Sequence, residues 1–345
     1  MATRPRQRDI AARAQVSQTT VSLVLNGKSR QYGITAETER RIMAAIAELR
    51  YVPSVTAQAL RGGRNGLIGV HTFEPLFPTG PEHYYYEFMV GIEQQATAAG
   101  QDLVMITSVH QSGEDPSIYR EGTNRLRIAD GAVIVGFHEQ DEELEALARQ
   151  QFPFVFIGRR RRAAELMPYV VPDYVEGVAE TVRLIAERGH QRVAYLAGRG
   201  QMMPREQRFA GFRKGRAATG VELVQHLRVE ADEITAELIT SLRRRSVSAV
   251  IIDSYPLTEQ FGTICDAMGV AIGNELAVVC LDSLGYGASR AWTHLQSPRR
   301  NLGARAVDIL LGLLNGDHPR TYHELLPCPI RPGSTLLPLA TMSGS

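Results

Sequence analysis

The sequence predicts a small all-α helix-turn-helix head followed by an α/β two-lobed core with two doubly wound parallel sheets. Short amphipathic helical patterns occupy the N-terminal residues, and no strand pattern interrupts them. From residue 66 onward, apolar strand-like runs alternate with amphipathic helices, and this rhythm occurs twice. A chain of 345 residues is long enough to bury such a core in two or three domains.

The head is expected to contain helices at residues 7–14, 17–25 and 36–49. Ser17 and Thr35 can cap the second and third helices. A small residue at Ala11 lets the second helix cross close above the first. Apolar or small side chains that should point inward are Ile10, Ala11, Ala14, Val16, Val21 and Val24. The second helix then presents Gln18, Thr19, Thr20, Ser22 and Leu23 outward.

The net charge of +1 hides an asymmetry along the chain. Residues 1–64 hold eleven Lys and Arg against four Asp and Glu, a net charge of +7, which leaves −6 for the remainder. A basic head on an acidic body suits a nucleic-acid-binding protein, because phosphate neutralisation supplies much of the affinity. A solvated basic face is an equally good interpretation of the charge alone.

Cysteine usage and hydropathy exclude several protein classes. Cys265, Cys280 and Cys328 are widely spaced and lack a paired ligand pattern, so we interpret them as core thiols rather than metal or redox residues. No run of about 18 apolar residues and no apolar signal core is present. We therefore expect a cytoplasmic protein with no membrane association, no metal site and no cofactor.

Strands and helices alternate through the body. The expected strands are 67–72, 102–107, 132–135 and 154–157, and then, in a second round, 169–171, 192–196, 249–252 and 277–281. The expected helices are 84–99 and 141–150, then 175–188, 205–219 and 257–268. Ligands of such sheets bind at the carboxyl ends of the strands, which places a binding site between the lobes.

A short helix is expected between the head and the body. Pro53 and Ser54 favour its start, and Gly62 and Gly63 end it. Such a helix is too short to persist alone in water, so its folding requires a partner. A flexible linker is the alternative.

A resemblance to a known family is carried by the run from Asp9 to Lys28, which is similar to the signature of the lactose-repressor (LacI/GalR) family of transcriptional regulators. The matching segments that follow are Thr38–Ile42, Ala47–Ser54 and Ala57–Arg61. In the body, Ala129–Val135, Phe154–Ile157, Gly189–Ala194, Arg208–Phe212 and Leu276–Asp282 resemble the family's periplasmic-binding-protein-like core. The resemblance thus spans nearly the whole chain.

That resemblance implies a sequence-specific DNA-binding transcriptional regulator, a repressor that binds a near-palindromic operator in double-stranded DNA as a homodimer. It implies a bacterial cytoplasmic protein that is nucleoid-associated when bound to its operator. Gln18 and Thr19 should reach base edges in the major groove, and Leu60 should wedge into the minor groove. The full set expected to contact DNA is Arg8, Ser17, Gln18, Thr19, Thr20, Ser22, Leu23, Asn26, Tyr51, Ala57, Leu60 and Arg61.

Two positions of the head depart from the family pattern. Leu23 stands where members often carry a base-contacting Arg, and Gln15 replaces a frequent turn Gly. Leu23 can pack on a thymine methyl group but cannot pair with guanine, which alters the expected half-site. A partly buried helix residue is the alternative interpretation of Leu23.

The resemblance also implies a small polar effector, such as a sugar, bound between the lobes and controlling operator affinity. Arg208 and Asp282 match positions that commonly hold effector hydroxyl or carboxylate groups. A surface Arg208 or a helix-capping Asp282 is the alternative. Asp253-Ser254 stands where many sugar-binding members show Asn-Asp. One aromatic residue before the first helix of the body should line the cleft, and from Tyr84, Tyr85, Tyr86 and Phe88 we choose Tyr86. The expected effector-binding residues are therefore Tyr86, Arg208, Asp253, Ser254 and Asp282.

The predicted domains are a helix-turn-helix domain at 1–53, a hinge helix and linker at 54–65, and an effector-binding and dimerisation core at 66–345. Within the core, the first lobe is expected at 66–162 and 295–325, and the second at 163–294 and 326–340.

Other functions stay open at this point. An activator or a corepressor-dependent repressor would share these residues, and a remote alternative is an α/β enzyme fused to a DNA-binding head. We expect no catalytic residues, because the chain lacks a Gly-x-Ser-x-Gly motif and Gly27-Lys28-Ser29 has Ser22 where a phosphate loop needs Gly.

Overall fold

A computed structural model describes residues 5–25, 27–51, 64–74, 84–107, 117–136, 141–162, 164–200, 202–285 and 287–339. The chain divides into two compact units, Met1–Asn65 and Gly66–Ser345. Residues 54–63 of the expected hinge helix lie outside the described residues.

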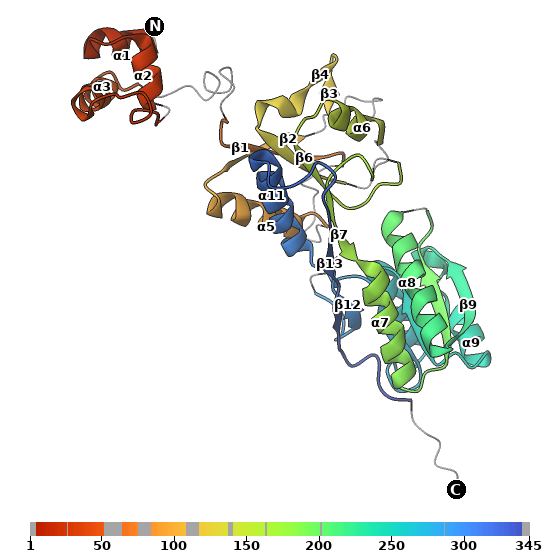
Figure 1. The fold of residues 1–345 in the computed structure, drawn as a ribbon. Helices are drawn as coiled ribbons and strands as arrows, with labels where there is room; N and C mark the ends of the chain where they lie inside the picture. Colours follow the sequence, from red (N-terminus) through yellow and green to blue (C-terminus); the bar gives the residue numbers. More distant parts are fainter. Residues whose placement is uncertain are drawn as a thin grey trace. The chain divides into compact units, whose positions relative to one another are not determined.

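The head is built from α1 (Gln7–Ala14), α2 (Gln18–Leu25) and α3 (Ala36–Glu48), drawn in red in Figure 1. Ile10, Val21 and Ile42 are fully buried where the helices meet. The inward-facing set expected from the sequence is confirmed, since Ala11, Ala14 and Val24 join this cluster and Val16 packs against it. Burial of this apolar face is what stabilises helices too short to persist alone.

Local hydrogen bonds define where the helices of the head begin and end. Ser17 Oγ accepts the backbone N–H of Thr20 at 3.1 Å, which caps α2, and Thr35 Oγ1 accepts from Thr38 at 3.2 Å, which caps α3. At the end of α1, Gln15 adopts a left-handed conformation with φ 53° and ψ 49°. The turn between α1 and α2 therefore holds a non-glycine residue in backbone geometry that favours glycine.

In the first lobe, six described strands form one sheet in the order β13-β7-β6-β5-β1-β2. They are β1 (Leu67–Thr72), β2 (Asp102–Thr107), β5 (Gly131–Val135), β6 (Phe154–Ile157), β7 (Tyr169–Asp173) and β13 (His323–Pro327), and all neighbours pair in parallel. A small hairpin of β3 (Tyr119–Arg120) and β4 (Thr123–Asn124) and the 3₁₀ turn η1 (Arg125–Ile128) precede β5.

Helices cover both faces of this sheet. Val133 belongs to the cluster under α5 (Tyr86–Ala98) and α11 (Arg299–Asn315), whereas its neighbour Ile134 packs with α6 (Asp141–Arg149) and η1 on the opposite face. Burial on both faces explains why the strands read as continuous apolar runs.

In the second lobe, six described strands follow the order β14-β12-β11-β10-β8-β9. They are β8 (Arg192–Ala197), β9 (Glu222–Arg228), β10 (Ala249–Ile252), β11 (Ala277–Cys280), β12 (Thr293–Leu295) and β14 (Ile330–Arg331), with only the β12–β14 pair antiparallel among them. The helices are α7 (Tyr174–Glu187), α8 (Met203–Thr219), α9 (Ala236–Arg244) and α10 (Tyr255–Ala267), with the 3₁₀ turn η2 (Ala231–Glu233).

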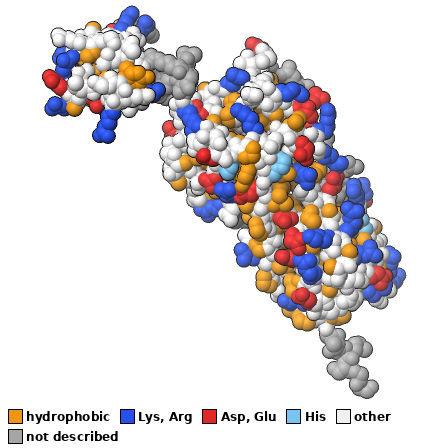
Figure 2. All heavy atoms as spheres, viewed as in Figure 1, with side chains coloured by type: hydrophobic (Ala, Val, Ile, Leu, Met, Phe, Trp, Pro, Cys, Tyr) orange, Lys and Arg blue, Asp and Glu red, His pale blue; other side chains and the backbone are white. Residues whose placement is uncertain are grey.

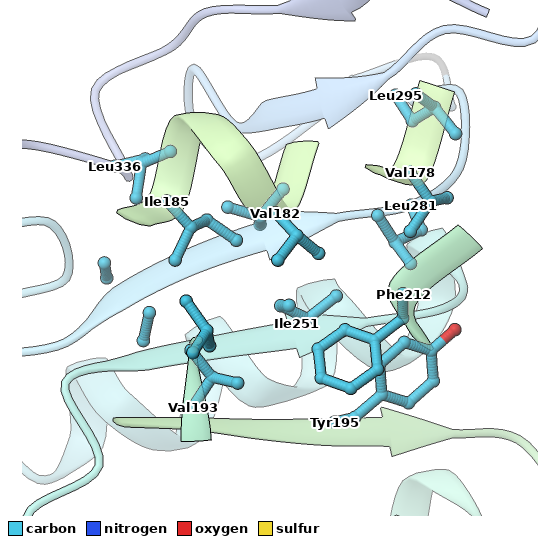
Figure 3. Packing of buried hydrophobic residues seen from close by; sticks show 14 of the residues in the cluster. Val178, Val182, Ile185, Val193, Tyr195, Phe212, Ile251, Leu281, Leu295 and Leu336 are labelled. Atoms are coloured by element: carbon cyan, nitrogen blue, oxygen red, sulfur yellow. The ribbon is translucent and has the colours of Figure 1, made fainter. Parts of the chain in front are cut away.

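The core of the second lobe shows the same two-sided burial. Val182 of α7, Phe212 of α8 and Tyr195 of β8 pack together on one face (Figure 3). On the other face, Leu196 of β8 packs with residues of α9 and α10, including Phe261.

The strand β7 corrects the expected lobe boundary. The sequence analysis started the second lobe at residue 163, but β7 pairs with β6 and with β13 in the first sheet, and Figure 1 shows β7 and β13 side by side. The chain enters the second lobe only at α7, returns to the first at α11, and crosses again between β13 and β14. An apolar strand reads alike in either sheet, so its pattern does not reveal which partner it joins.

Candidate functional site

The outer face of α2 carries the polar side chains that the sequence analysis assigned to base contacts. Gln18 and Thr19 are exposed at the beginning of the helix, next to the exposed cap Ser17. Thr20 and Ser22 are half-buried, and the Thr20 hydroxyl is hydrogen-bonded to Ser17 Oγ at 2.8 Å. The beginning of α2 therefore offers an exposed amide and an exposed hydroxyl on a capped helix, a geometry suited to reading base edges.

The flanks of α2 differ in what they expose. Leu23 is half-buried without joining the hydrophobic cluster of the head, so its side chain lies at the rim of the α2 surface. Arg8 has 69% of its side chain exposed, while Tyr51 packs against the head cluster. Lys and Arg side chains stand out on the visible face of the head in Figure 2. Asn26, Ala57, Leu60 and Arg61 lie outside the described residues.

A cavity of about 270 Å³ lies at the carboxyl ends of β5, β6 and β7, and we call it the Tyr84 cavity. Tyr84 and the first-lobe strands line it on one side, and Tyr174 of α7 and the first turn of α8 line it on the other. This is where a doubly wound sheet binds ligands, and the volume is close to that of small-metabolite sites. The apolar lining consists of Phe88, Val135, Phe156, Ile157, Val171, Pro172, Met202, Met203, Pro204 and Leu302.

The polar lining of the Tyr84 cavity is dominated by arginine. Four consecutive arginines follow β6 after Gly158, and all of them line the cavity: Arg159, Arg160, Arg161 and Arg162. Asp141 is the carboxylate among the described lining residues. Arg160 is nearly buried: its guanidinium lies 4.6 Å from the Phe156 ring centroid, and its Nη2 donates to the Gly136 carbonyl at 3.2 Å. Gln207, Tyr84 and Tyr174 are further lining residues with polar side-chain groups, and the Tyr174 hydroxyl donates to Ser297 Oγ at 3.4 Å.

Two of the expected effector residues lie together behind the cavity wall. Arg208 Nη2 donates to Asp282 Oδ1 at 3.3 Å, and the Arg208 guanidinium stacks 4.5 Å from the centroid of the Tyr174 ring. The two residues thus support the wall through Tyr174, without being among the residues that line the cavity. Close packing of α7 and α8 sets this arrangement, because a Cβ at Gly211 would lie only 2.5 Å from the Val175 carbonyl oxygen.

Asp253 and Ser254 also lie behind the wall. Asp253 is fully buried and accepts hydrogen bonds from Arg205 Nε at 2.9 Å and from the Gly198 backbone at 3.1 Å. Ser254 is half-buried at the beginning of α10. In the described structure, Asp253 orders the loops at the carboxyl ends of β8 and β10.

The structure places Tyr86 away from the Tyr84 cavity. Tyr84 lines the cavity, while the Tyr86 side chain is 51% exposed and faces a separate groove. Burial raises the pKa of Tyr84, so its hydroxyl is neutral. The Arg299 guanidinium stacks 4.3 Å from the centroid of the Tyr84 ring. The reason is helix phase: Tyr84 and Phe88 are four residues apart and share one face of α5 and its preceding turn.

Comparisons with known proteins agree with the two-part organisation. Residues 8–54 match the model for bacterial regulatory proteins of the lacI family, and residues 182–336 match that for a periplasmic binding protein-like domain. The maltose regulon regulatory protein MalI of Escherichia coli (strain K12) is 30% identical over 249 residues, 70% of each chain. The chain belongs to the lacI family of bacterial regulatory proteins.

Other relatives of this lacI-family chain cover different shares of it. The sucrose operon repressor of Klebsiella pneumoniae is 29% identical over 63% of this chain, which spans 62% of the repressor. The regulator DegA of Bacillus subtilis (strain 168) is 25% identical over 86% of this chain and 87% of its own length. The expected family is thus confirmed, and the chain is a DNA-binding transcriptional regulator.

Solved structures of lacI-family proteins share the fold. A Lac repressor dimer bound to operator and the anti-inducer ONPF has a TM-score of 0.71 at 22% identity, covering 97% of this chain and 100% of that one. The CelR–cellobiose complex has a TM-score of 0.63 at 24% identity, covering 96% and 100%. The expected fold, a helical head and a two-lobed core with parallel sheets, is confirmed.

The sequence analysis of this lacI-family chain missed the arginine run. Four consecutive arginines one residue after an expected strand at 154–157 were a usable signal, because the carboxyl end of a parallel strand is where ligands bind. Tyr84 was considered but not chosen, because the helix phase before α5 cannot be read from four neighbouring aromatic residues.

Three further features of the described residues concern thiols, metal ligands and membrane-spanning helices. Cys265, Cys280 and Cys328 are free and buried, as expected, and burial raises the pKa of each thiol to about 12. In the described part of the chain, no group of three His, Cys, Asp or Glu side chains could hold a metal ion. None of the described helices is long and apolar enough to span a bilayer.

Proposed function

We propose that this regulator is a repressor whose affinity for a near-palindromic operator is controlled by a small polar metabolite bound in the Tyr84 cavity. The observation that carries this proposal is the position of the cavity, which is lined both by first-lobe strands and by the first turn of α8. A ligand in contact with both lobes favours one lobe arrangement, and its differential affinity for the two arrangements changes operator binding.

The DNA side of the proposal rests on α2. Gln18 and Thr19 would contact base edges, while hydroxyl groups at Thr20 and Ser22 and the basic side chain of Arg8 would lie near phosphates. Asn26, Ala57, Leu60 and Arg61 belong to the same proposed surface, with Leu60 entering the minor groove. Operator binding requires contact with the chromosome, so the proposed place of action is the bacterial cytoplasm.

Dimerisation is part of the same proposal. One recognition helix covers only a few base pairs, so a near-palindromic operator requires two copies related by a two-fold axis. The similarity to a Lac repressor dimer supports this arrangement. We propose a homodimer that works as a binding protein and leaves its effector chemically unchanged.

The test begins with the operator. Genomic fragments retained by the purified full chain are sequenced, and we expect an enriched near-palindrome that a Gln18→Ala, Thr19→Ala double variant no longer selects. Retention without sequence preference would contradict the DNA-binding half of the proposal.

The effector half is tested on that operator by fluorescence anisotropy. Metabolites that raise the thermal unfolding temperature of the full chain are added, and a true effector should change operator affinity by about 5- to 150-fold. Recovery of the ligand unchanged is expected. Its conversion to a product would favour an enzyme instead.

A further inference from the structure

The four arginines at 159–162 differ in whether a carboxylate lies close to them. Within the described residues, Asp141 Oδ1 lies 3.9 Å from Arg160 Nε, and Glu145 Oε1 lies 3.9 Å from Arg162 Nε. Arg161 forms an ion pair with Glu206 of α8. Each of these three arginines therefore has a carboxylate partner.

Arg159 differs from its three neighbours. It lines the Tyr84 cavity and is exposed, and no carboxylate lies within 4.0 Å of its guanidinium among the described residues. Among the described residues, no carboxylate therefore pairs with the positive charge of Arg159 at the cavity wall. An arginine guanidinium presents paired N–H donors that match phosphate and carboxylate oxygens.

The other residues that line the cavity indicate what kind of molecule would carry a phosphate or carboxylate group to Arg159. The Phe156 and Leu302 side chains belong to an apolar wall suited to one face of a ring or a short carbon chain. Gln207 and the Tyr84 hydroxyl can donate and accept hydrogen bonds with hydroxyl groups. A purely neutral ligand would leave Arg159 without a matching charge.

We infer that the effector of this regulator is an anionic metabolite, a sugar-sized molecule bearing a phosphate or carboxylate group that binds Arg159. This inference rests on the proposed function and deepens it, because it assigns a charge to the ligand of the Tyr84 cavity. Arg160, held between Phe156 and the Gly136 carbonyl, also lines the cavity and adds a second guanidinium to its lining.

The test measures thermal unfolding of the full chain at constant ionic strength with inorganic phosphate, D-glucose 6-phosphate, D-gluconate or neutral D-glucose. Two variants are compared, Arg159→Gln in the cavity and Arg244→Gln on the exposed surface of α9, which removes an equal charge elsewhere. A ligand that binds only the folded state stabilises it by RT ln(1 + [L]/Kd), so the rise in unfolding temperature at a fixed ligand concentration reports affinity.

We expect inorganic phosphate and at least one sugar anion to stabilise the wild-type chain and Arg244→Gln. Arg159→Gln should lose at least about tenfold in affinity for that anion, because a charge-assisted hydrogen bond is removed. The two sugar anions are then compared with each other. Stabilisation by glucose 6-phosphate and not by gluconate assigns a phosphate group, and the reverse assigns a carboxylate.

Three outcomes overturn the inference: no anion stabilises the wild-type chain, Arg159→Gln responds to anions as strongly as Arg244→Gln, or neutral glucose stabilises all three chains equally. The second outcome would also expose anion binding at the basic head, which both variants retain. If a neutral metabolite changes operator affinity in the anisotropy experiment, the anion inference fails while the proposed function stands. If anions bind through Arg159 but no ligand changes operator affinity, the proposed function fails instead.

Discussion

Asp282 Oδ1 accepts hydrogen bonds from Arg208 Nη2 at 3.3 Å and from Arg299 Nη2 at 2.9 Å. Arg208 belongs to α8 of the second lobe, whereas Arg299 begins α11 of the first. A single carboxylate therefore joins the two lobes behind the Tyr84 cavity. The Arg208 guanidinium stacks on the Tyr174 ring, and the Arg299 guanidinium stacks on the Tyr84 ring. The same ion-pair network therefore contacts two aromatic residues that line the cavity.

Replacing Asp282 should destabilise the core. Asp282→Asn leaves two poorly exposed guanidinium groups without their carboxylate, and loss of one partner from a buried ion pair costs about 3 kcal/mol. The free energy of unfolding of the full chain in urea measures this loss. Asp266→Asn is the control, because its pair with Arg290 is at the surface and should change stability by less than about 1 kcal/mol. Equal losses in the two variants would mean that Asp282 has no special structural role.

Gln18 and Arg8 should affect DNA binding in different ways. Gln18→Ala should cost about 1–3 kcal/mol and relax base preference at one half-site position, because a side-chain amide can pair bidentately with adenine. Arg8→Ala should weaken all sequences alike and reduce the salt dependence of binding, because a phosphate contact carries no sequence information. Anisotropy titrations against operators with single base changes measure both. A uniform loss for Gln18→Ala would show that this residue does not read bases.

The turn between α1 and α2 should be stabilised by a smaller residue. Gln15 has φ 53°, and the left-handed conformation costs a residue with a Cβ about 1–2 kcal/mol, whereas glycine adopts it freely. Gln15→Gly should therefore raise the free energy of unfolding of the head by about 0.5–1 kcal/mol. Calorimetry of the full chain measures the head transition. Gln15→Ala retains the strain and should bring no such gain; an equal gain from alanine would place the effect outside the backbone.

His71 should make the first lobe sensitive to acid. Burial lowers the pKa of His71 from 6.5 to about 4, and its Nδ1 lies 2.6 Å from the Ile106 carbonyl oxygen. The unfolded chain therefore binds the proton more readily than the folded chain. The resulting stability is fully present above about pH 6.5 and is lost as the pH falls toward 4, by up to about 3 kcal/mol.

Urea unfolding between pH 7 and pH 4 tests the role of His71, with His71→Asn as the variant that retains a donor at this position but does not titrate. The variant should be less stable at neutral pH and show a shallower decline with acid. Parallel pH profiles for the two proteins would assign the decline to other groups.

Local pattern was sufficient for the elements whose neighbours are close in sequence. The spacing of Ile10, Val21 and Val24 determined the packing of the head, since helices of this length are amphipathic at a fixed period. Ser17 could be assigned as a cap because its hydrogen bond reaches only three residues along the chain. The alternation of apolar strand runs with amphipathic helices was likewise a local pattern, and it was sufficient to predict a two-lobed α/β core.

Tertiary structure decided which distant segments share a site. Whether β7 joins the first or the second sheet depends on its partners β6 and β13. Because β13 is about 150 residues further along the chain, the periodicity of β7 does not reveal this pairing.

The choice of Tyr84 over Tyr86 depends on the phase of the turn before α5. Glu206 and Asp141 come from two other helices and pair with the neighbours of Arg159, whereas no carboxylate of the described residues pairs with Arg159 itself. Sequence alone determined the family, the head and the kinds of element, because these follow from local periodicity and motif. The ligand cavity was decided by the packing of chain segments far apart in sequence, because side-chain charge and direction acquire meaning only beside their neighbours in space.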